Sequence, residues 1–197
     1  MYPNCVRNLI DCLKDLPGIG EKSAERLAFS IINFDKDKID NFSKSLSDLE
    51  NIKKCPICNN ITDMDICYIC SDENRSYETI FVVEKAKDII LFEKMGNYNG
   101  KYHVLDGLIS PLEGINPEDI NIDSLIKRVE ENDVKELIIV LKPSIEGETT
   151  TQYIKKVLSK YNVKFSKIPI GIPMGTDIEY IDSMTLEMAF EDRKEIS

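Results

Sequence analysis

The sequence has no tryptophan, a single histidine and no long hydrophobic run among its 197 residues. The absence of a long apolar run indicates that no segment spans a membrane. The first fifteen residues, MYPNCVRNLIDCLKD, have neither the apolar core nor the small-residue cleavage site of a secretory signal. One histidine excludes the HExxH motif, and a Ser-His-Asp triad could use only His103, which we interpret as a structural residue in a strand. We therefore expect a cytoplasmic protein that makes no membrane contact.

Positive charge is also scarce. The chain has 25 Lys and Arg against 35 Asp and Glu, a formal net charge of -10. The deficit is not uniform, because residues 1–30 carry four basic and four acidic side chains whereas residues 77–197 carry 15 basic and 22 acidic ones. We therefore expect the acidic surface of the later residues to face water, metal or a basic protein partner.

The spacing of apolar residues changes along the chain. Helical spacing predicts two short facing helices in the first thirty residues and a third helix near residues 39–49, before a cysteine-rich patch. Strands are expected at 79–83, 101–105, 136–141 and 163–168, with helices at 86–95, 122–132 and 149–161 and a last helix at 181–194. This alternation predicts a parallel sheet. The fold class expected is multidomain α+β, with a helical N-terminal domain, a small metal-binding module, an α/β domain and a C-terminal helix.

Four of the six cysteines form two CxxC pairs, separated by eight residues, in CPICNNITDMDICYIC. They are Cys55, Cys58, Cys67 and Cys70. Two such turns can close a tetrahedral all-sulfur shell, which is typical of structural zinc sites. An iron-sulfur cluster is the alternative. The patch is too short to hold an apolar core, so we expect one structural zinc ion per chain. The other two, Cys5 and Cys12, are expected to be small buried thiols on one helix face.

The stretch LPGIGEKSAERLAF, residues 16–29, joins the first two expected helices. Gly18 and Gly20 permit positive φ and close approach of the backbone to a partner. The free amides and positive dipole end of the second helix attract a phosphate, and Lys22 and Arg26 share one face of that helix. The pattern predicts a helix-hairpin-helix that binds DNA. The alternative is a plain helical hairpin with two solvated basic residues.

Three glutamates follow expected strands. Glu84 comes directly after the strand at 79–83, and Glu146 and Glu148 follow the strand at 136–141. Because parallel strands end at the same edge of a sheet, these carboxylates could converge and hold magnesium. Alternatively, Glu146 and Glu148 complement a helix N-terminus, and Glu84 pairs with a neighbouring lysine.

Taken together, these segments resemble the RecR family of bacterial recombination mediators over nearly the whole chain and in the same order. The stretches that carry the resemblance are LPGIGEKSAERLAF, the four-cysteine patch, VVEKAKDIILFEK, YHVLDGLISPLEGINPEDI, IEGETT and GIPMGTDIEYIDSMTL. The resemblance implies a helix-hairpin-helix DNA-binding domain at 1–53, a four-cysteine zinc finger at 54–76, a Toprim domain at 77–165, and a Walker-B-like segment with a helix at 166–197.

The resemblance also implies a function. Proteins of this family form a homodimer or a ring-like homotetramer that can encircle DNA, and they act with RecO, and in many bacteria RecF, in recombinational DNA repair. Together they load RecA onto single-stranded DNA coated by single-strand binding protein. Carried over to this chain, Lys22 and Arg26 are the DNA contacts beside Gly18 and Gly20.

The same resemblance makes Glu84, Glu146 and Glu148 the Toprim acidic set. RecR proteins are not known as catalysts, and their acidic patch is linked to RecO binding. The alternative is a magnesium-dependent nuclease, primase or topoisomerase, since these enzymes also use Toprim carboxylates. A topoisomerase needs a tyrosine nucleophile in a further domain and a primase needs a fuller catalytic region, so we expect no enzyme activity.

Overall fold

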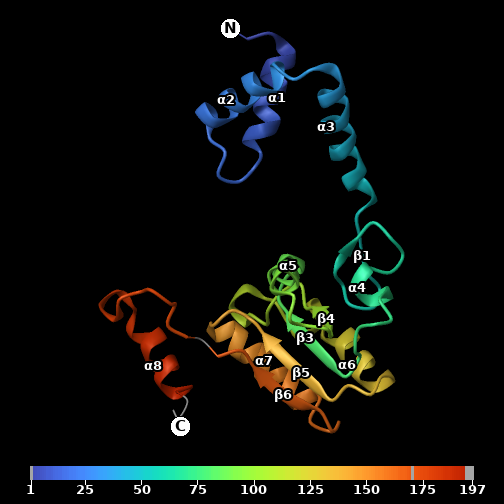
Figure 1. Ribbon diagram of the computed structural model, residues 1–197, viewed down its shortest axis with the longest axis vertical. Helices are drawn as coiled ribbons and strands as arrows, with labels where there is room; N and C mark the ends of the chain where they lie inside the picture. Colours follow the sequence, from blue (N-terminus) through green and yellow to red (C-terminus); the bar gives the residue numbers. More distant parts are fainter. Residues whose placement is uncertain (1, 170, 194–197) are drawn as a thin grey trace. The chain divides into compact units, whose positions relative to one another are not determined.

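The computed structural model of the chain describes residues 2–169 and 171–193 (Figure 1). The chain divides into two compact units, Met1–Ile52 and Lys53–Ser197. No helix of the described residues is long and apolar enough to cross a membrane. The helices are α1 (Asn4–Lys14), α2 (Glu21–Ile32), α3 (Lys36–Asp48), α4 (Tyr68–Ser71), α5 (Ala86–Met95), α6 (Ile122–Glu131), α7 (Ile145–Val157) and α8 (Ser183–Glu191). The strands are β1 (Lys53–Lys54), β2 (Ile61–Thr62), β3 (Thr79–Val83), β4 (Lys101–Val104), β5 (Glu136–Val140) and β6 (Lys164–Lys167).

The first unit is built on the pair α1 and α2. Ile10 of α1 packs against Ala24 and Ala28 of α2, and all three side chains are buried. The two alanines let the helices approach closely because they carry no bulk beyond Cβ. Helix α3 begins after Asp35, whose carboxylate accepts a hydrogen bond from the Lys38 amide at 2.8 Å, and it has no buried residue. The core of this unit is therefore small and lies between α1 and α2.

Cys5 and Cys12, expected to be buried, are both exposed. The expectation of a shared helix face is sound, but that face of α1 is not the one that packs on α2. Ile10 occupies the contact with Ala24 and Ala28 instead, and Val6, Leu9 and Leu13 of α1 pack beside it.

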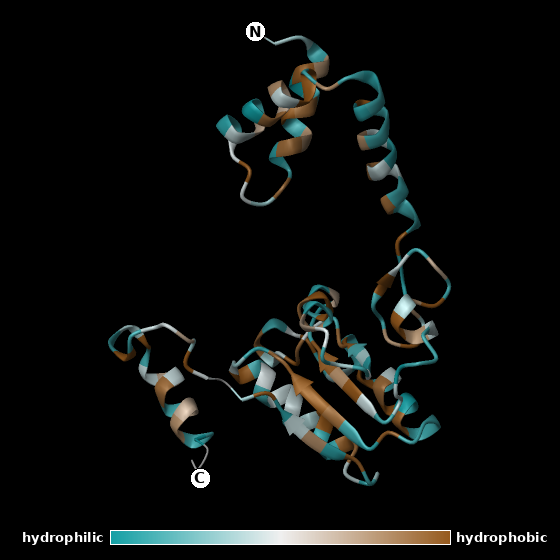
Figure 2. Cartoon of the chain, viewed as in Figure 1, coloured by the Kyte–Doolittle hydropathy of each residue, from teal (hydrophilic) through white to brown (hydrophobic). Residues whose placement is uncertain are grey.

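The second unit contains a parallel four-stranded sheet in the order β4-β3-β5-β6. Figure 2 shows apolar residues concentrated in its central strands, β3 and β5. Burial on both faces explains why TIFVV at β3 is a continuous apolar run rather than an alternating one. The parallel sheet and the helices that alternate with its strands confirm the fold class expected from the sequence.

The two faces of the sheet are covered by different helices. Ile80, Val82 and Leu137 pack with α6 and α7 on one face. Phe81 and Val83 pack with α5 on the other face, together with Ile69 of α4. The small module that carries the four cysteines thus shares a core with the sheet.

Helix α7 begins earlier than the spacing of its apolar residues predicts. The expected start was residue 149, but the helix starts at Ile145 because Ser144 caps it, accepting a hydrogen bond from the Gly147 amide at 3.2 Å. A side chain at position 147 would not fit, since its Cβ would lie 2.1 Å from the Lys142 carbonyl oxygen. The last expected helix, at 181–194, is observed as α8, and residue 194 lies outside the described residues.

The single histidine is part of the sheet core. His103 lies in β4, is fully buried, and shares a hydrogen bond of 2.8 Å between its Nε2 and the Asn121 carbonyl oxygen. Burial lowers the pKa of His103 to about 3, and the nearby Arg128 charge acts in the same direction. The structure confirms the structural interpretation of this residue.

The buried histidine predicts a specific dependence of stability on pH. An unfolded chain protonates its histidine near pH 6.5, whereas the folded chain holds it neutral down to about pH 3, so the unfolded state binds more protons in this window. Stability must then fall as the pH falls below about 6.5. Between pH 7.5 and 5.5 the loss from this residue is about 1.4 kcal/mol.

Urea unfolding of wild type and His103→Gln at these two pH values, with zinc present, measures this effect. A glutamine amide can donate to the same carbonyl but does not titrate. We expect the variant to lose about 1.4 kcal/mol less than wild type over this interval. Equal losses in both proteins would contradict the assignment.

Candidate functional site

The turn between α1 and α2 presents backbone amides at the start of α2. Gly18 has φ +83°, a conformation that L side chains rarely adopt, and the Ile19 amide closes the turn on the Leu16 carbonyl at 3.1 Å. Gly20 precedes α2, and no side chain caps this helix N-terminus. The first amides of α2 therefore have no partner within the helix and can bind an anion.

Only one of the two glycines needs its special backbone freedom. Gly20 has φ -86°, which any residue can adopt, so the expectation of positive φ holds for Gly18 alone. A Cβ at position 20 would meet nothing within 4 Å, but it would stand beside the free amides. Glycine at position 20 therefore leaves the free amides accessible to a ligand, and it is not needed for the backbone conformation.

The two basic residues expected to contact DNA are exposed on α2. Among the described residues neither Lys22 nor Arg26 forms an ion pair. The adjacent acid Glu21 is paired instead with Lys14, whose Nζ lies 2.5 Å from its Oε2, and this interaction raises the pKa of Lys14. Glu25 accepts a hydrogen bond of 3.0 Å from the Tyr2 hydroxyl. The negative charge beside Lys22 is thus partly compensated, and both cations are available to a phosphate backbone.

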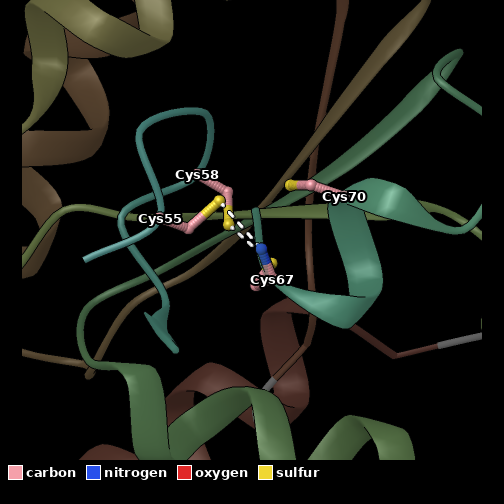
Figure 3. Close-up of side chains that lie close together, drawn as sticks. All are labelled: Cys55, Cys58, Cys67 and Cys70. Atoms are coloured by element: carbon pink, nitrogen blue, oxygen red, sulfur yellow. Dashed lines mark hydrogen bonds between the residues drawn. The ribbon is translucent and has the colours of Figure 1, made fainter. Parts of the chain in front are cut away.

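The four cysteines expected to bind zinc come together in the second unit (Figure 3). Their sulfur atoms all lie within 4.8 Å of one another, and each residue is at most 5% exposed. Zinc–sulfur bonds of about 2.3 Å in a tetrahedron place sulfurs roughly 3.8 Å apart, so the cluster has the size of a four-thiolate site. Cys58 and Cys67 are 3.5 Å apart, Sγ to Sγ. The residues fit zinc.

The local backbone explains why these turns hold sulfur. Asn59 has φ +60°, its amide donates to the Cys55 carbonyl at 2.9 Å, and the Cys55 amide donates to the Asn60 carbonyl at 2.7 Å. The Cys67 amide points at Cys55 Sγ, 3.5 Å away. Hydrogen bonds with Cys67 and then Cys70, followed by burial, raise the pKa of Cys58 in the absence of metal. A bound cation reverses that preference because it stabilises thiolates.

The cysteine module has almost no other core. In the part of the chain that the structure describes, only Ile57 and Ile69 pack against the four cysteines as partly buried apolar residues. Within the module itself, metal binding can therefore replace the missing apolar core, in line with the expectation of a structural zinc ion.

Among the described residues, Glu84 forms no metal-sized group with the other two glutamates of the expected acidic set. It follows β3, lines a cavity with Lys85, Lys87 and Lys142, and its Oε1 lies 3.7 Å from Lys85 Nζ. Within residues 2–169 and 171–193, the only group of three or more potential ligand side chains close enough to hold a metal ion is the cysteine cluster. Magnesium at these glutamates is not supported.

Glu146 and Glu148 lie in the first turn of α7. Negative charge is stabilised there by the positive end of the helix dipole. The Ser144 hydroxyl lowers the pKa of Glu146. Gln152 and then Lys167 lower the pKa of Glu148, with Lys167 Nζ 2.9 Å from Glu148 Oε2. These contacts match the alternative drawn from the sequence, in which both residues complement a helix N-terminus.

Two buried cations beside the cysteine module were not anticipated. Lys101 is fully buried in β4, and Arg128 of α6 is 4% exposed. The only signal for Arg128 is its spacing, three residues after the buried Leu125 on the apolar stripe of α6. Lys101 follows a glycine at a strand start, and nothing in the sequence distinguishes it from an exposed lysine.

Comparisons with known proteins agree with this arrangement. Residues 6–49 match the family model "RecR, helix-hairpin-helix", and residues 52–72 match the model of the RecR four-cysteine zinc finger domain. Residues 78–169 match the Toprim domain, and residues 171–194 match "RecR, C-terminal". The four matches follow one another along the chain in the order in which the segments are described above.

Two curated relatives are similar over their whole length. "Recombination protein RecR" of Natranaerobius thermophilus is 44% identical over 196 residues, which cover 99% of this chain and 98% of that protein. "Recombination protein RecR" of Lactobacillus helveticus is 47% identical over 194 residues, 98% of each chain. With matches of this extent and four domain models in the right order, the chain belongs to the RecR family of recombination proteins.

Proposed function

We propose that this protein is a DNA-binding mediator of recombinational DNA repair that acts with RecO and RecF to load RecA onto single-stranded DNA coated by single-strand binding protein. Membership of the RecR family supports a role in recombinational repair. The observation that carries the DNA-binding part is the uncapped N-terminus of α2 with Lys22 and Arg26 exposed beside it. Action on DNA in the cytoplasm is part of the proposal.

The DNA contacts would be made mainly to phosphate. Backbone amides and lysine or arginine side chains bind phosphate oxygens without reading bases, so the affinity falls steeply with salt. With two cations per chain, a single copy would bind DNA weakly. Several linked copies would raise the affinity through multivalency.

An exposed apolar groove on the first unit supports assembly of several copies. The groove lies between α1, α2 and α3 and is lined by Val6, Leu9, Ile32, Phe42 and Leu46, among others. Phe42 is 43% exposed and Leu46 is 56% exposed. Apolar surface of this kind in a soluble domain is typical of a protein contact. We propose that a second copy of the chain covers it in the homodimer or ring-like homotetramer expected of a clamp.

The cysteine cluster is proposed to hold one structural zinc ion through Cys55, Cys58, Cys67 and Cys70. When bound, zinc supplies four metal–sulfur bonds and leaves no position for substrate, so its contribution is to folding. The chain's own residues bury the site and orient the thiolates.

We also propose that the protein is not an enzyme and that Glu84, Glu146 and Glu148 belong to a partner-binding surface. Glu84 is paired with Lys85, and Glu148 is paired with Lys167. Ionised carboxylates held in this way can meet a basic partner such as RecO, and they do not need a metal to be stable.

The proposal is tested by RecA loading. On single-stranded DNA coated with single-strand binding protein, RecO plus this protein should shorten the lag before RecA hydrolyses ATP, compared with RecO alone. A variant with Lys22 and Arg26 both changed to glutamate should lose most of this effect. A lag that does not respond to the wild-type protein in the presence of RecO and RecF would contradict the proposal.

A further inference from the structure

Two buried cations lie between the cysteine module and the sheet, and neither has an acidic partner. Lys101 and Arg128 form no ion pair among the residues that the structure describes. A buried charge is strongly unfavourable unless an opposite charge or a set of hydrogen bonds compensates it. The described side chains around Lys101 and Arg128 provide no opposite charge in ion-pair contact, so another source of negative charge is needed to explain their burial.

Lys101 reaches from β4 to the end of α4. Its Nζ donates to the carbonyl oxygens of Asp72 at 2.7 Å, Ile69 at 2.9 Å and Cys70 at 3.3 Å. It also lies 4.5 Å from the centre of the Tyr77 ring. Three acceptors use all three N–H groups of an ammonium ion, so the residue is held as a cation directly behind Cys70.

Arg128 approaches the module from α6. Its Nη1 donates to the Tyr102 carbonyl of edge strand β4, while Nε and Nη2 are buried and have no hydrogen-bond partner. It lines a cavity together with Pro56 and Ile57, which lie between the first two cysteines. Arg128 thus lies beside the cysteine module. Among the described residues, no acceptor binds its Nε and Nη2 groups and no acidic side chain pairs with its charge.

The positive charges of Lys101 and Arg128 match the net negative charge expected of a zinc–thiolate cluster. A zinc ion with four thiolates carries roughly two net negative charges, and such a cluster is costly to bury. We propose that Lys101 and Arg128 are the counter-charges of the zinc–thiolate centre and are positioning residues for it, holding the cysteine module against β4. The inference rests on the proposed zinc site, and it assigns to the sheet domain a direct part in metal retention.

Two further hydrogen bonds join the cysteine module to β4 and α6. The Val104 amide donates to the Cys58 carbonyl at 2.8 Å, and Asn59 Nδ2 donates to Ser124 Oγ at 3.1 Å. The module therefore covers part of the exposed edge of β4, which would otherwise present unpaired backbone groups. Weaker zinc binding in a charge-removal variant should accordingly be accompanied by faster amide exchange of Val104.

The test compares charge-removing with charge-preserving variants of the full chain. Lys101→Met and Arg128→Met remove a charge, Lys101→Arg and Arg128→Lys keep it, and Lys127→Met is the matched control because Lys127 is adjacent to Arg128 but less buried. Zinc release to a chromophoric chelator should be at least about tenfold faster in the Met variants, close to wild type in the charge-preserving variants, and unchanged within about twofold in the control.

A second measurement separates charge from packing. In the cobalt-substituted protein, loss of a neighbouring cation raises the energy of the sulfur electrons, so the sulfur-to-cobalt charge-transfer band should move to longer wavelength in the Met variants. If Lys101 and Arg128 only contributed to packing, the Met variants would be less stable to unfolding but would keep the wild-type charge-transfer band. Met variants with the wild-type release rate and band would overturn the inference.

The inference stays testable if the Met variants do not fold. Lys101→Arg and Arg128→Lys would then decide it, because a folded charge-preserving variant with fast zinc release and a shifted band would show that charge is not the cause. If no variant binds zinc because the wild type does not, zinc analysis of the wild type shows that the proposed zinc site itself has failed.

Discussion

Replacing Lys22 and Arg26 with glutamate should weaken DNA binding by two orders of magnitude or more and leave the fold intact. Each substitution removes a cation from the helix face that meets phosphate and adds a repelling anion. Neither side chain is buried, and neither is in an ion pair among the described residues, so the free energy of unfolding should change by no more than about 0.5 kcal/mol. Fluorescence anisotropy with labelled single-stranded and gapped DNA at several salt concentrations measures the affinity.

The matched control for this prediction is the double variant Lys36→Glu with Lys44→Glu. These lysines are exposed on α3 in the same unit and change the net charge by the same amount. If the control loses as much affinity as the variant at α2, then general charge rather than the α2 site governs binding. If the α2 variant binds like wild type, the site assignment is wrong.

Changing Cys58 to serine should release zinc and unfold the cysteine module. Cys58 is fully buried, its sulfur is 3.5 Å from that of Cys67, and the module has almost no apolar core besides the cysteines. A structural zinc site can contribute on the order of 10 kcal/mol to folding, so the loss should lower the melting temperature by many degrees. Zinc content per chain and thermal unfolding measure the effect.

Cys12→Ser is the control, because Cys12 is an exposed cysteine of the other unit. It should keep one zinc ion per chain and the wild-type melting curve. A Cys58→Ser protein with full zinc and unaltered melting would contradict the prediction. A coloured wild-type protein with iron in place of zinc would favour the iron-sulfur alternative instead.

The parts of the fold that depend on local pattern could be predicted from the sequence. IFVV of β3 and LIIV of β5 are continuous apolar runs with no exposed residue, as expected for central strands of a sheet covered on both faces. The two CxxC turns bring four sulfurs close together, as their spacing predicts. Gly18 was predictable for the same reason, since its backbone conformation is set by a short local turn.

The errors concern contacts between elements. The early start of α7 depends on one cap by Ser144, which apolar spacing does not reveal. Cys5 shares a helix face with Cys12 as expected, but whether that face is buried is decided by what packs on it. The strands end at one edge as expected, but Glu84 and Glu148 pair with different lysines, and within the described residues the three glutamates form no group close enough to hold a metal ion.

The central claim is that the protein is a DNA clamp and not a nuclease, and one anisotropy trace tests it most directly. Zinc-loaded protein is mixed with end-labelled gapped DNA in magnesium buffer, followed over time and repeated with rising salt. The account predicts a rise that holds steady and becomes smaller as salt increases. A decay below the value of free DNA would mean that the DNA is cleaved, and would contradict it.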